Sequence, residues 1–209
     1  MVTKPTGTAD LDVMDVWIGY LDIPFDTTIT PPAGWTQRFA TDDGAETGFK
    51  FACFTKTASS EGASWTWTLS AAADHIWAAH AAAGGTGSLT GTASGIGRAG
   101  GASTYTSPSI TPGANGALIR AGFFTDTNSS RTITPDSSPV ATEEIELIAN
   151  DNQHIYTERY EQTTAAAQAL DMTYSSTVAQ QTLTGIIAWA PSVGSGNTYT
   201  KTGLAVIGP

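Results

Sequence analysis

The sequence predicts an all-β protein, a jelly-roll-like β-sandwich built from two diverged halves of four to five strands each. Charged residues make up only 13% of the 209 residues, and 22 residues are Gly. This composition favours a turn-rich β protein over a helical bundle. Several short segments alternate apolar with polar residues, the period of a half-buried strand. The order of these segments also repeats, since Thr-Ile-Thr-Pro occurs at 28–31 and again at 132–135.

The first half contains four strand-like segments and one Thr/Pro turn. The clearest strand is SWTWTLS (64–70), in which Trp65, Trp67 and Leu69 face one way because successive side chains of a strand alternate. The others are VMDVWIGYL (13–21), FKFACFTKT (49–57) and HIWAAHAAA (75–83). Propensity alone would make the Ala-rich stretch 71–83 a helix. Its strand-like counterpart in the second half favours a strand from His75 onward, after one helical turn at most.

The second half presents the same features in the same order. They are ALIRAGFF (117–124), the turn at 132–135, IYTERYEQT (155–163), ALDMTYS (169–175) and LTGIIAWAP (183–191). Pro31 and Pro135 end strand pairing and turn the chain at equivalent places. We interpret 11–83 and 115–191 as diverged copies, although any Thr-rich β protein resembles itself to some degree.

The two copies are expected to form one domain over residues 1–209. A single small sheet leaves one apolar face uncovered, whereas two half-sheets packed face to face bury both. The Gly/Ser-rich segment 84–114 then crosses over at the surface and supplies an edge strand near STYTSPSI (103–110). Residues 202–208 close a sheet as a final strand. A flexible linker between two separate domains is the alternative for 84–114.

Charge and cysteine content exclude several classes of partner. The formal net charge is −10, and a nucleic-acid binder needs cations to displace phosphate counterions. Nucleic acid is therefore not an expected partner. Membrane insertion is not expected either, because no apolar run approaches the length of a bilayer span. The N-terminal stretch MVTKPTGTADLD shows no secretory signal. The single Cys53 cannot form an intramolecular disulfide and is expected in the core.

No motif predicts catalysis. GIGRAG (95–100) matches Gly-x-Gly-x-x-Gly, but it follows no buried strand and opens no helix, so a loop is expected. His75 and His80 would face opposite sides of a strand and form no metal pair. The loops that contain Asp42, Asp43 and Asp151 are rich in oxygen ligands, yet they match no known calcium loop. We therefore expect no enzyme and no cofactor, with calcium at these loops as a weak alternative.

The six Trp residues carry the most functional promise. Five lie in strand patterns, where an indole fills the core. Trp35 differs because it ends the turn PPAGWT. It is expected to fold back over the edge of the sandwich, and stacking on a glycan is the alternative.

The assembled pattern resembles small β-sandwich virion proteins of tailed bacteriophages and gene-transfer agents. The phrases that carry the resemblance are PTGTADLDV, TTITPPAGWT, FTKTASSEG, SWTWTLS and SPSITPGANGALIRAGFF. The second half departs from it, because TITPDSSPVAT lacks an equivalent of Trp35. The resemblance implies a non-enzymatic virion structural protein, made in the host cytoplasm and placed on the particle exterior. It carries over no catalytic residues.

Two placements and several partners remain open at this stage. The protein is expected to decorate the capsid or form a spike on it; the alternative is a tail-tip, fibre or carbohydrate-binding module that recognises a host glycan. Other virion proteins and further copies of the chain are the expected partners. The polar N-terminal arm, with Val2, Lys4 and Pro5, either anchors the chain to a neighbour or pairs along its own sandwich.

Overall fold

The computed structural model describes residues 1–21, 27–42, 48–82, 89–97, 102–126, 133–135, 140–148, 153–178, 182–191 and 206–208. Every regular element in these ranges is a strand, so the expected helical turn before His75 does not form. No described segment is a helix that could span a membrane. The predicted all-β sandwich is confirmed.

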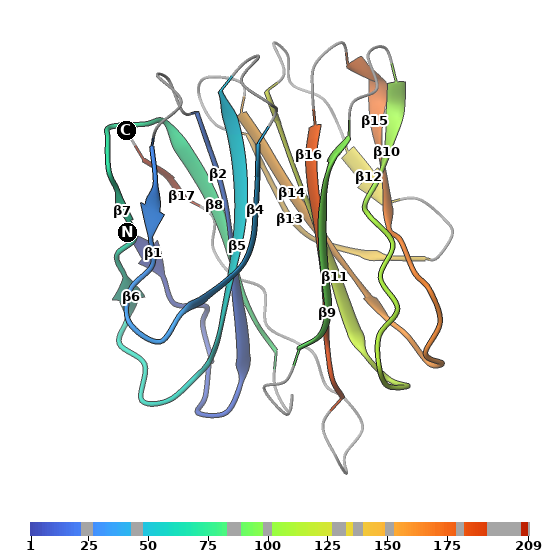
Figure 1. The fold of residues 1–209 in the computed structure, drawn as a ribbon, viewed down its shortest axis with the longest axis horizontal. Helices are drawn as coiled ribbons and strands as arrows, with labels where there is room; N and C mark the ends of the chain where they lie inside the picture. Colours follow the sequence, from blue (N-terminus) through green and yellow to red (C-terminus); the bar gives the residue numbers. More distant parts are fainter. Residues whose placement is uncertain are drawn as a thin grey trace.

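Two five-stranded antiparallel sheets face each other at the centre of the molecule (Figure 1). The first sheet has the order β17(Val206–Gly208), β8(His75–Ala82), β2(Val13–Leu21), β5(Phe49–Thr57) and β4(Thr36–Asp42). The second has the order β13(Thr142–Ile148), β14(Gln153–Glu161), β11(Leu118–Asp126), β16(Thr182–Trp189) and β9(Leu89–Gly97). Each half of the chain thus supplies four strands of one sheet. The jelly-roll-like detail stays a prediction.

The two sheets repeat one design. The order β8-β2-β5-β4 in the first corresponds to β16-β11-β14-β13 in the second. Both edge strands carry a bulge at the same place, between Gln37 and Phe39 in β4 and between Glu143 and Ile145 in β13. The alignment differs from the sequence estimate by two residues at two strands, because β5 begins at 49 and β14 at 153, while β8 begins at 75 and β16 at 182.

The last strand of each half is exchanged between the sheets. β9 follows β8 in the chain but pairs with β16 of the second sheet, from Leu89 opposite Trp189 to Gly97 opposite Thr182. β17 follows β16 but pairs with β8 of the first sheet. The expectation of a surface crossover at 84–114 is wrong for 89–97, because the otherwise unpaired edge of β16 takes this segment as a full strand. The closing strand expected at 202–208 is found at Val206–Gly208.

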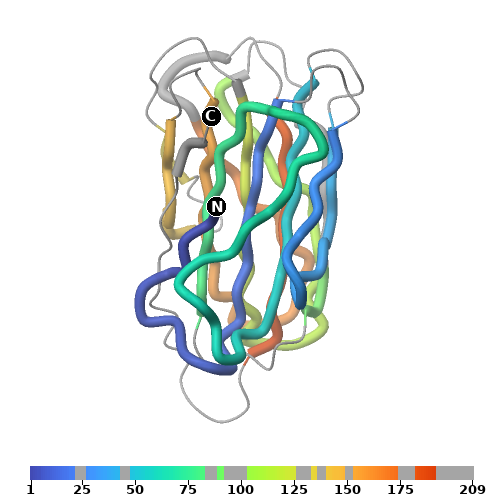
Figure 2. Tube along the Cα trace, turned by 90° about the vertical axis from the view of Figure 1, so that its left-hand side faces the viewer, coloured from blue at the N-terminus to red at the C-terminus, as the bar shows by residue number. Residues whose placement is uncertain are grey.

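A thinner layer covers the outer face of each sheet. Over the first sheet lie two ribbons, β1(Val2–Thr3) with β6(Ser64–Trp65) and β3(Ile29–Thr30) with β7(Thr68–Leu69). These segments and the N-terminus cross the face seen in Figure 2. Over the second lies a sheet of β10(Ala102–Thr106), β15(Asp171–Val178) and β12(Ile133–Pro135). The molecule therefore has one core between the two large sheets and one beneath each cover.

Aromatic rings and glycines fit together along the contact between the two central strands. A Cβ at Gly122 of β11 would overlap Trp17 of β2, and one at Gly19 of β2 would overlap Phe124 of β11. In each contact the two residues are 105 positions apart, which is the offset between the two halves. The two-fold relation that exchanges the halves therefore exchanges the two residues of each contact. The local two-fold relation between the halves therefore runs between β2 and β11.

Gly122→Ala tests this packing. The added methyl group would overlap the rings of Trp17 and Phe51, both fully buried, and overpacking a dense core costs about 1–3 kcal/mol. Urea denaturation should show this loss. Gly91→Ala in β9 is the matched control, because its nearest neighbour atom would lie 3.7 Å away, and it should be neutral or slightly stabilising. Equal stability of both variants would contradict the packing described.

Candidate functional site

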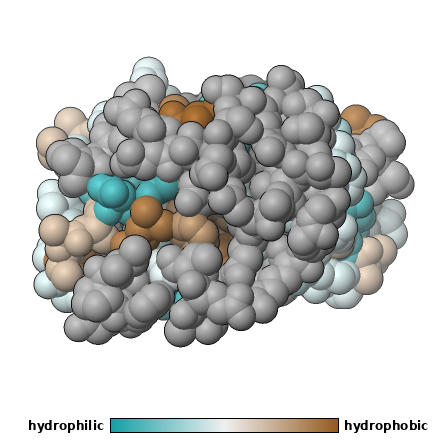
Figure 3. Space-filling view, turned by 90° about the horizontal axis from the view of Figure 1, so that it is seen from above, coloured by the Kyte–Doolittle hydropathy of each residue, from teal (hydrophilic) through white to brown (hydrophobic). Residues whose placement is uncertain are grey.

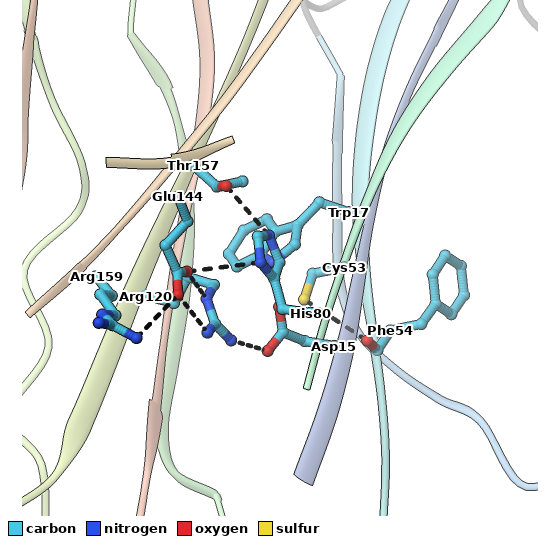
Figure 4. Close-up of polar contacts among 9 residues, drawn as sticks. All are labelled: Asp15, Trp17, Cys53, Phe54, His80, Arg120, Glu144, Thr157 and Arg159. Carbon is cyan, nitrogen blue, oxygen red and sulfur yellow. Dashed lines mark hydrogen bonds and ion pairs between the residues drawn. The ribbon is translucent and has the colours of Figure 1, made fainter. Parts of the chain in front are cut away.

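A cluster of charged side chains lies between the two large sheets (Figure 4). Arg120 projects from β11 and its Nη1 contacts Asp15 Oδ2 of β2. The two residues occupy equivalent positions of the two halves. Each lies two residues before the Trp17–Gly122 contact along its strand. Arg120 is 1% exposed and Asp15 0%. Asp15 Oδ1 also accepts a hydrogen bond from Trp17 Nε1, at 2.6 Å, so the carboxylate is paired on both oxygens.

Glu144 enters the cluster because of the bulge in β13. The register passes from Glu143 opposite Glu158 to Ile145 opposite Thr157, which leaves Glu144 as the extra residue. A bulge re-aims side chains, and here both Glu144 and Ile145 turn inward, with the Glu144 side chain only 3% exposed. Its carboxylate accepts hydrogen bonds from Arg120 Nε and, at 3.1 Å, from Arg120 Nη2. This fork is the geometry in which a guanidinium binds a carboxylate most strongly.

Three further side chains complete the cluster. His80 of β8 is fully buried, with Nε2 3.1 Å from Thr157 Oγ1 and Nδ1 3.6 Å from Glu144 Oε2. Arg159 of β14 lies 3.6 Å from Glu144 Oε1 and reaches solvent. Figure 4 shows Asp15 and His80 approaching from the first sheet and the other charged residues from the second.

Burial and neighbouring charges set the protonation states in the cluster. Burial, reinforced by the Arg120 charge, lowers the pKa of His80 to about 4. Burial alone would raise the pKa of Glu144, but Arg120, His80 and Arg159 outweigh it and lower that pKa. The carboxylates of Asp15 and Glu144 raise the pKa of Arg120 despite its burial. At neutral pH the charged Glu144 and Arg120 therefore face a neutral His80 ring.

This cluster joins the two sheets chemically. Arg120 bonds Asp15 of the other sheet with one nitrogen and Glu144 of its own sheet with two. A buried charge without a partner is costly, so any displacement of one sheet along the other is penalised. The cluster therefore fixes how the halves register against each other.

Arg120→Met should reveal this role. The substitution leaves two buried carboxylates without their cation, and removing one partner of a buried ion pair typically costs about 3–5 kcal/mol. Arg38→Met is the matched control: Arg38 occupies the bulge of β4 equivalent to Glu144, is exposed, and bonds Thr55 Oγ1. It should cost less than about 1 kcal/mol. Denaturant titration of both variants measures the difference, and equal losses would contradict the assignment.

Stability should fall as the pH falls below about 6.5. The unfolded chain binds a proton at His80 near that value, whereas the folded chain binds it only near pH 4. The unfolded state therefore holds more protons in this window, and one proton corresponds to about 1.4 kcal/mol per pH unit. The lowered pKa of Glu144 adds a loss in the same direction below its ordinary value of 4.5.

Unfolding free energies measured between pH 7 and pH 4.5 check this dependence. His80→Gln should flatten the slope between pH 6.5 and 4.5. The same change at half-buried His75 should leave the slope in place, because His80 remains. A slope that survives His80→Gln would show that another group dominates.

Trp35 lies in the core beneath the first cover. Its side chain is 7% exposed, and its ring centroid lies 5.1 Å from that of Trp65 and 5.0 Å from that of Trp67, both edge-on. Gly34, at φ 84°, makes the turn that brings it there. Trp35 thus folds back over the sheet, and its burial leaves almost no indole surface on which a glycan could stack.

The N-terminal arm lies on its own sandwich. Val2 pairs with Trp65 and is 2% exposed. Lys4 N donates to Ala63 O at 2.9 Å, and Lys4 Nζ to Glu61 O at 3.3 Å. Pro5 is buried. Of the two arrangements expected for the arm, this is the second, and an anchoring role would require these contacts to be released.

Of the three carboxylates considered for calcium, the structure describes one. Asp42 is exposed at the end of β4, while Asp43 and Asp151 lie outside the described ranges. No group of three His, Cys, Asp or Glu side chains in the described part of the chain is placed to hold a metal ion.

Cys53 is buried, as expected, and burial raises the pKa of its thiol.

A pocket of about 360 Å³ opens between the two ribbons of the first cover. Ile18 and Trp77, cross-strand neighbours in the sheet, line it from below. Ile29 of β3, Leu69 of β7 and Trp67, which precedes β7, line one side, and Met1 and Val2 the other. The remaining lining residues are Ser70, Ala71, Ala72, Ala73 and His75. The strand patterns predicted Trp67 and Trp77 in the core and did not indicate this gap.

Comparisons with known proteins return no match: no family model, no curated protein and no solved structure is significantly similar to this chain.

Proposed function

We propose that this chain is a non-enzymatic structural protein of a phage or phage-like particle, and that it decorates the capsid or forms a spike on it. The observation that carries the proposal is where the resembling phrases lie in the fold. PPAGWT forms the turn that positions Trp35, and SWTWTLS supplies Trp65 and Trp67, which contact it. Two of the phrases that carry the resemblance to virion sandwiches therefore build the aromatic packing on the outer face of the first sheet.

The use made of the ionisable groups supports a structural role. Asp15, Arg120, Glu144, His80 and Arg159 are held in one cluster of ion pairs and hydrogen bonds. Groups engaged in this way stabilise the sandwich and are shielded from a substrate. The net charge of −10 favours a soluble particle exterior and disfavours contact with packaged nucleic acid.

The proposed partners follow from a place on a particle. They are other virion proteins and further copies of this chain, because repeated parts commonly assemble with closed symmetry. The leucine at position 11 is a candidate contact: it is exposed and held at φ 71°. Its backbone N donates to Ala58 O at 2.8 Å, so the side chain is presented from a fixed turn.

Gold labelling of purified particles tests the placement. An antibody against the chain should label heads of particles that carry the gene, and particles lacking the gene should remain unlabelled. Adding the purified chain to the deficient particles should restore the label. Label confined to tail tips would favour the fibre alternative, and a protein absent from purified particles would overturn the proposal.

A further inference from the structure

The gap between the two cover ribbons has the features of a small binding site. Its volume of about 360 Å³ lies near the lower end of the range for ligand pockets, roughly 300–1,000 Å³. It therefore suits one ring of a ligand. Seen from above, hydrophobic and hydrophilic residues lie next to one another on the first-sheet side of the molecule (Figure 3). The lining contains no Asp, Glu, Lys or Arg side chain, and its basic groups are the His75 ring and the α-amino group of Met1. An ionic ligand would therefore lose its hydration without a charged side chain to replace it.

The lining supplies an indole ring and one hydrogen-bonding side chain. Trp67 is partly exposed, and its edge-on contacts with Trp35 and Phe54 fix its ring. Its Nε1 is closed to solvent and has no hydrogen-bond partner among the described residues. The indole therefore offers the pocket apolar ring surface, and the polar contact has to come from another residue.

His75 contributes an acceptor. Its Nδ1 lies 3.0 Å from Ala73 O, and a carbonyl oxygen only accepts, so Nδ1 carries the proton. In the neutral ring Nε2 is then an acceptor. A ligand hydroxyl can donate a hydrogen bond, and it therefore matches a site that offers one nitrogen acceptor beside apolar surface.

We propose that this pocket binds one uncharged pyranose ring. The C–H face of the sugar would pack on the apolar surface of Trp67, Ile29 and Leu69, and one of its hydroxyl groups would donate a hydrogen bond to His75 Nε2. This site differs from Trp35, which is buried behind Trp67. The inference does not rest on the particle assignment, since a sugar site fits either placement and can be tested on the isolated chain.

Saturation-transfer NMR with methyl glycosides tests the proposal on the full chain. The probes are the methyl glycosides of glucose, galactose, mannose and N-acetylglucosamine, with glucuronic acid as the charged comparison. At least one neutral glycoside should bind with an affinity in the millimolar range or better, and glucuronic acid should bind at least about 10-fold more weakly, about 1.4 kcal/mol. If none of the neutral glycosides binds at millimolar concentration, the proposal is wrong.

Two matched variants locate the site. Ala72→Trp places a large side chain at the exposed rim of the pocket, whereas Ala63→Trp adds the same side chain at an exposed position outside it. The first should abolish binding and the second should leave it unchanged, with melting temperatures close to wild type for both. His75→Phe keeps an aromatic ring but loses the nitrogen acceptor and should weaken binding about 10-fold. Unchanged affinity in Ala72→Trp would place the sugar elsewhere and overturn the proposal.

Discussion

The contact between Arg120 and Asp15 is the constraint on which the sandwich depends. It joins equivalent positions of two sheets with opposite charges, in an interior where neither residue is exposed. Glu144 holds the other side of the guanidinium. Because an unpaired buried charge costs several kcal/mol, the sheets are stable together only in the register that closes this cluster. The aromatic rings of Phe124 and Trp17, which pack against Gly19 and Gly122, lie farther along the same two strands.

Strand exchange and the outer covers further constrain how the two halves pack. β9 and β17 each leave their own half and complete the other sheet, so the halves cannot separate without breaking backbone pairing. The covers bury the outer faces beneath a second layer, and the gap in the first cover is where Trp67 becomes accessible. A rigid frame with function confined to its surface is what a particle protein requires, and the proposed sugar pocket would be such a surface function.

The elements that carry their own pattern were predictable from the sequence, and those that depend on long-range pairing were not. The repeated order predicted two facing sheets. The alternation of Trp65, Trp67 and Leu69 predicted one strand at 64–70, which the structure splits into β6 and β7 of the first cover. Residues 89–97 have no hydrophobic pattern of their own, so the exchange of β9 left no local signal. The pocket likewise arises from the spacing between two ribbons.

The central cluster did leave a signal in the sequence. Asp15 and Arg120 are single charges inside apolar strand segments, 105 residues apart and opposite in sign. Such a pair at equivalent positions of a repeat indicates a buried contact across the two-fold relation. The entry of Glu144 depends on a bulge, and the contact of His80 with Thr157 depends on how the sheets pack, so neither was visible.

A double-mutant cycle between Asp15 and Arg120 tests this account most directly. Unfolding free energies of wild type, Asp15→Asn, Arg120→Met and the double variant give the energy that couples the two residues. The account predicts a coupling of about 2 kcal/mol or more, since each single change leaves a buried charge without this partner. Losses that add to within about 0.5 kcal/mol would show that the two residues act independently, and would contradict the claim that this contact fixes the register of the sheets.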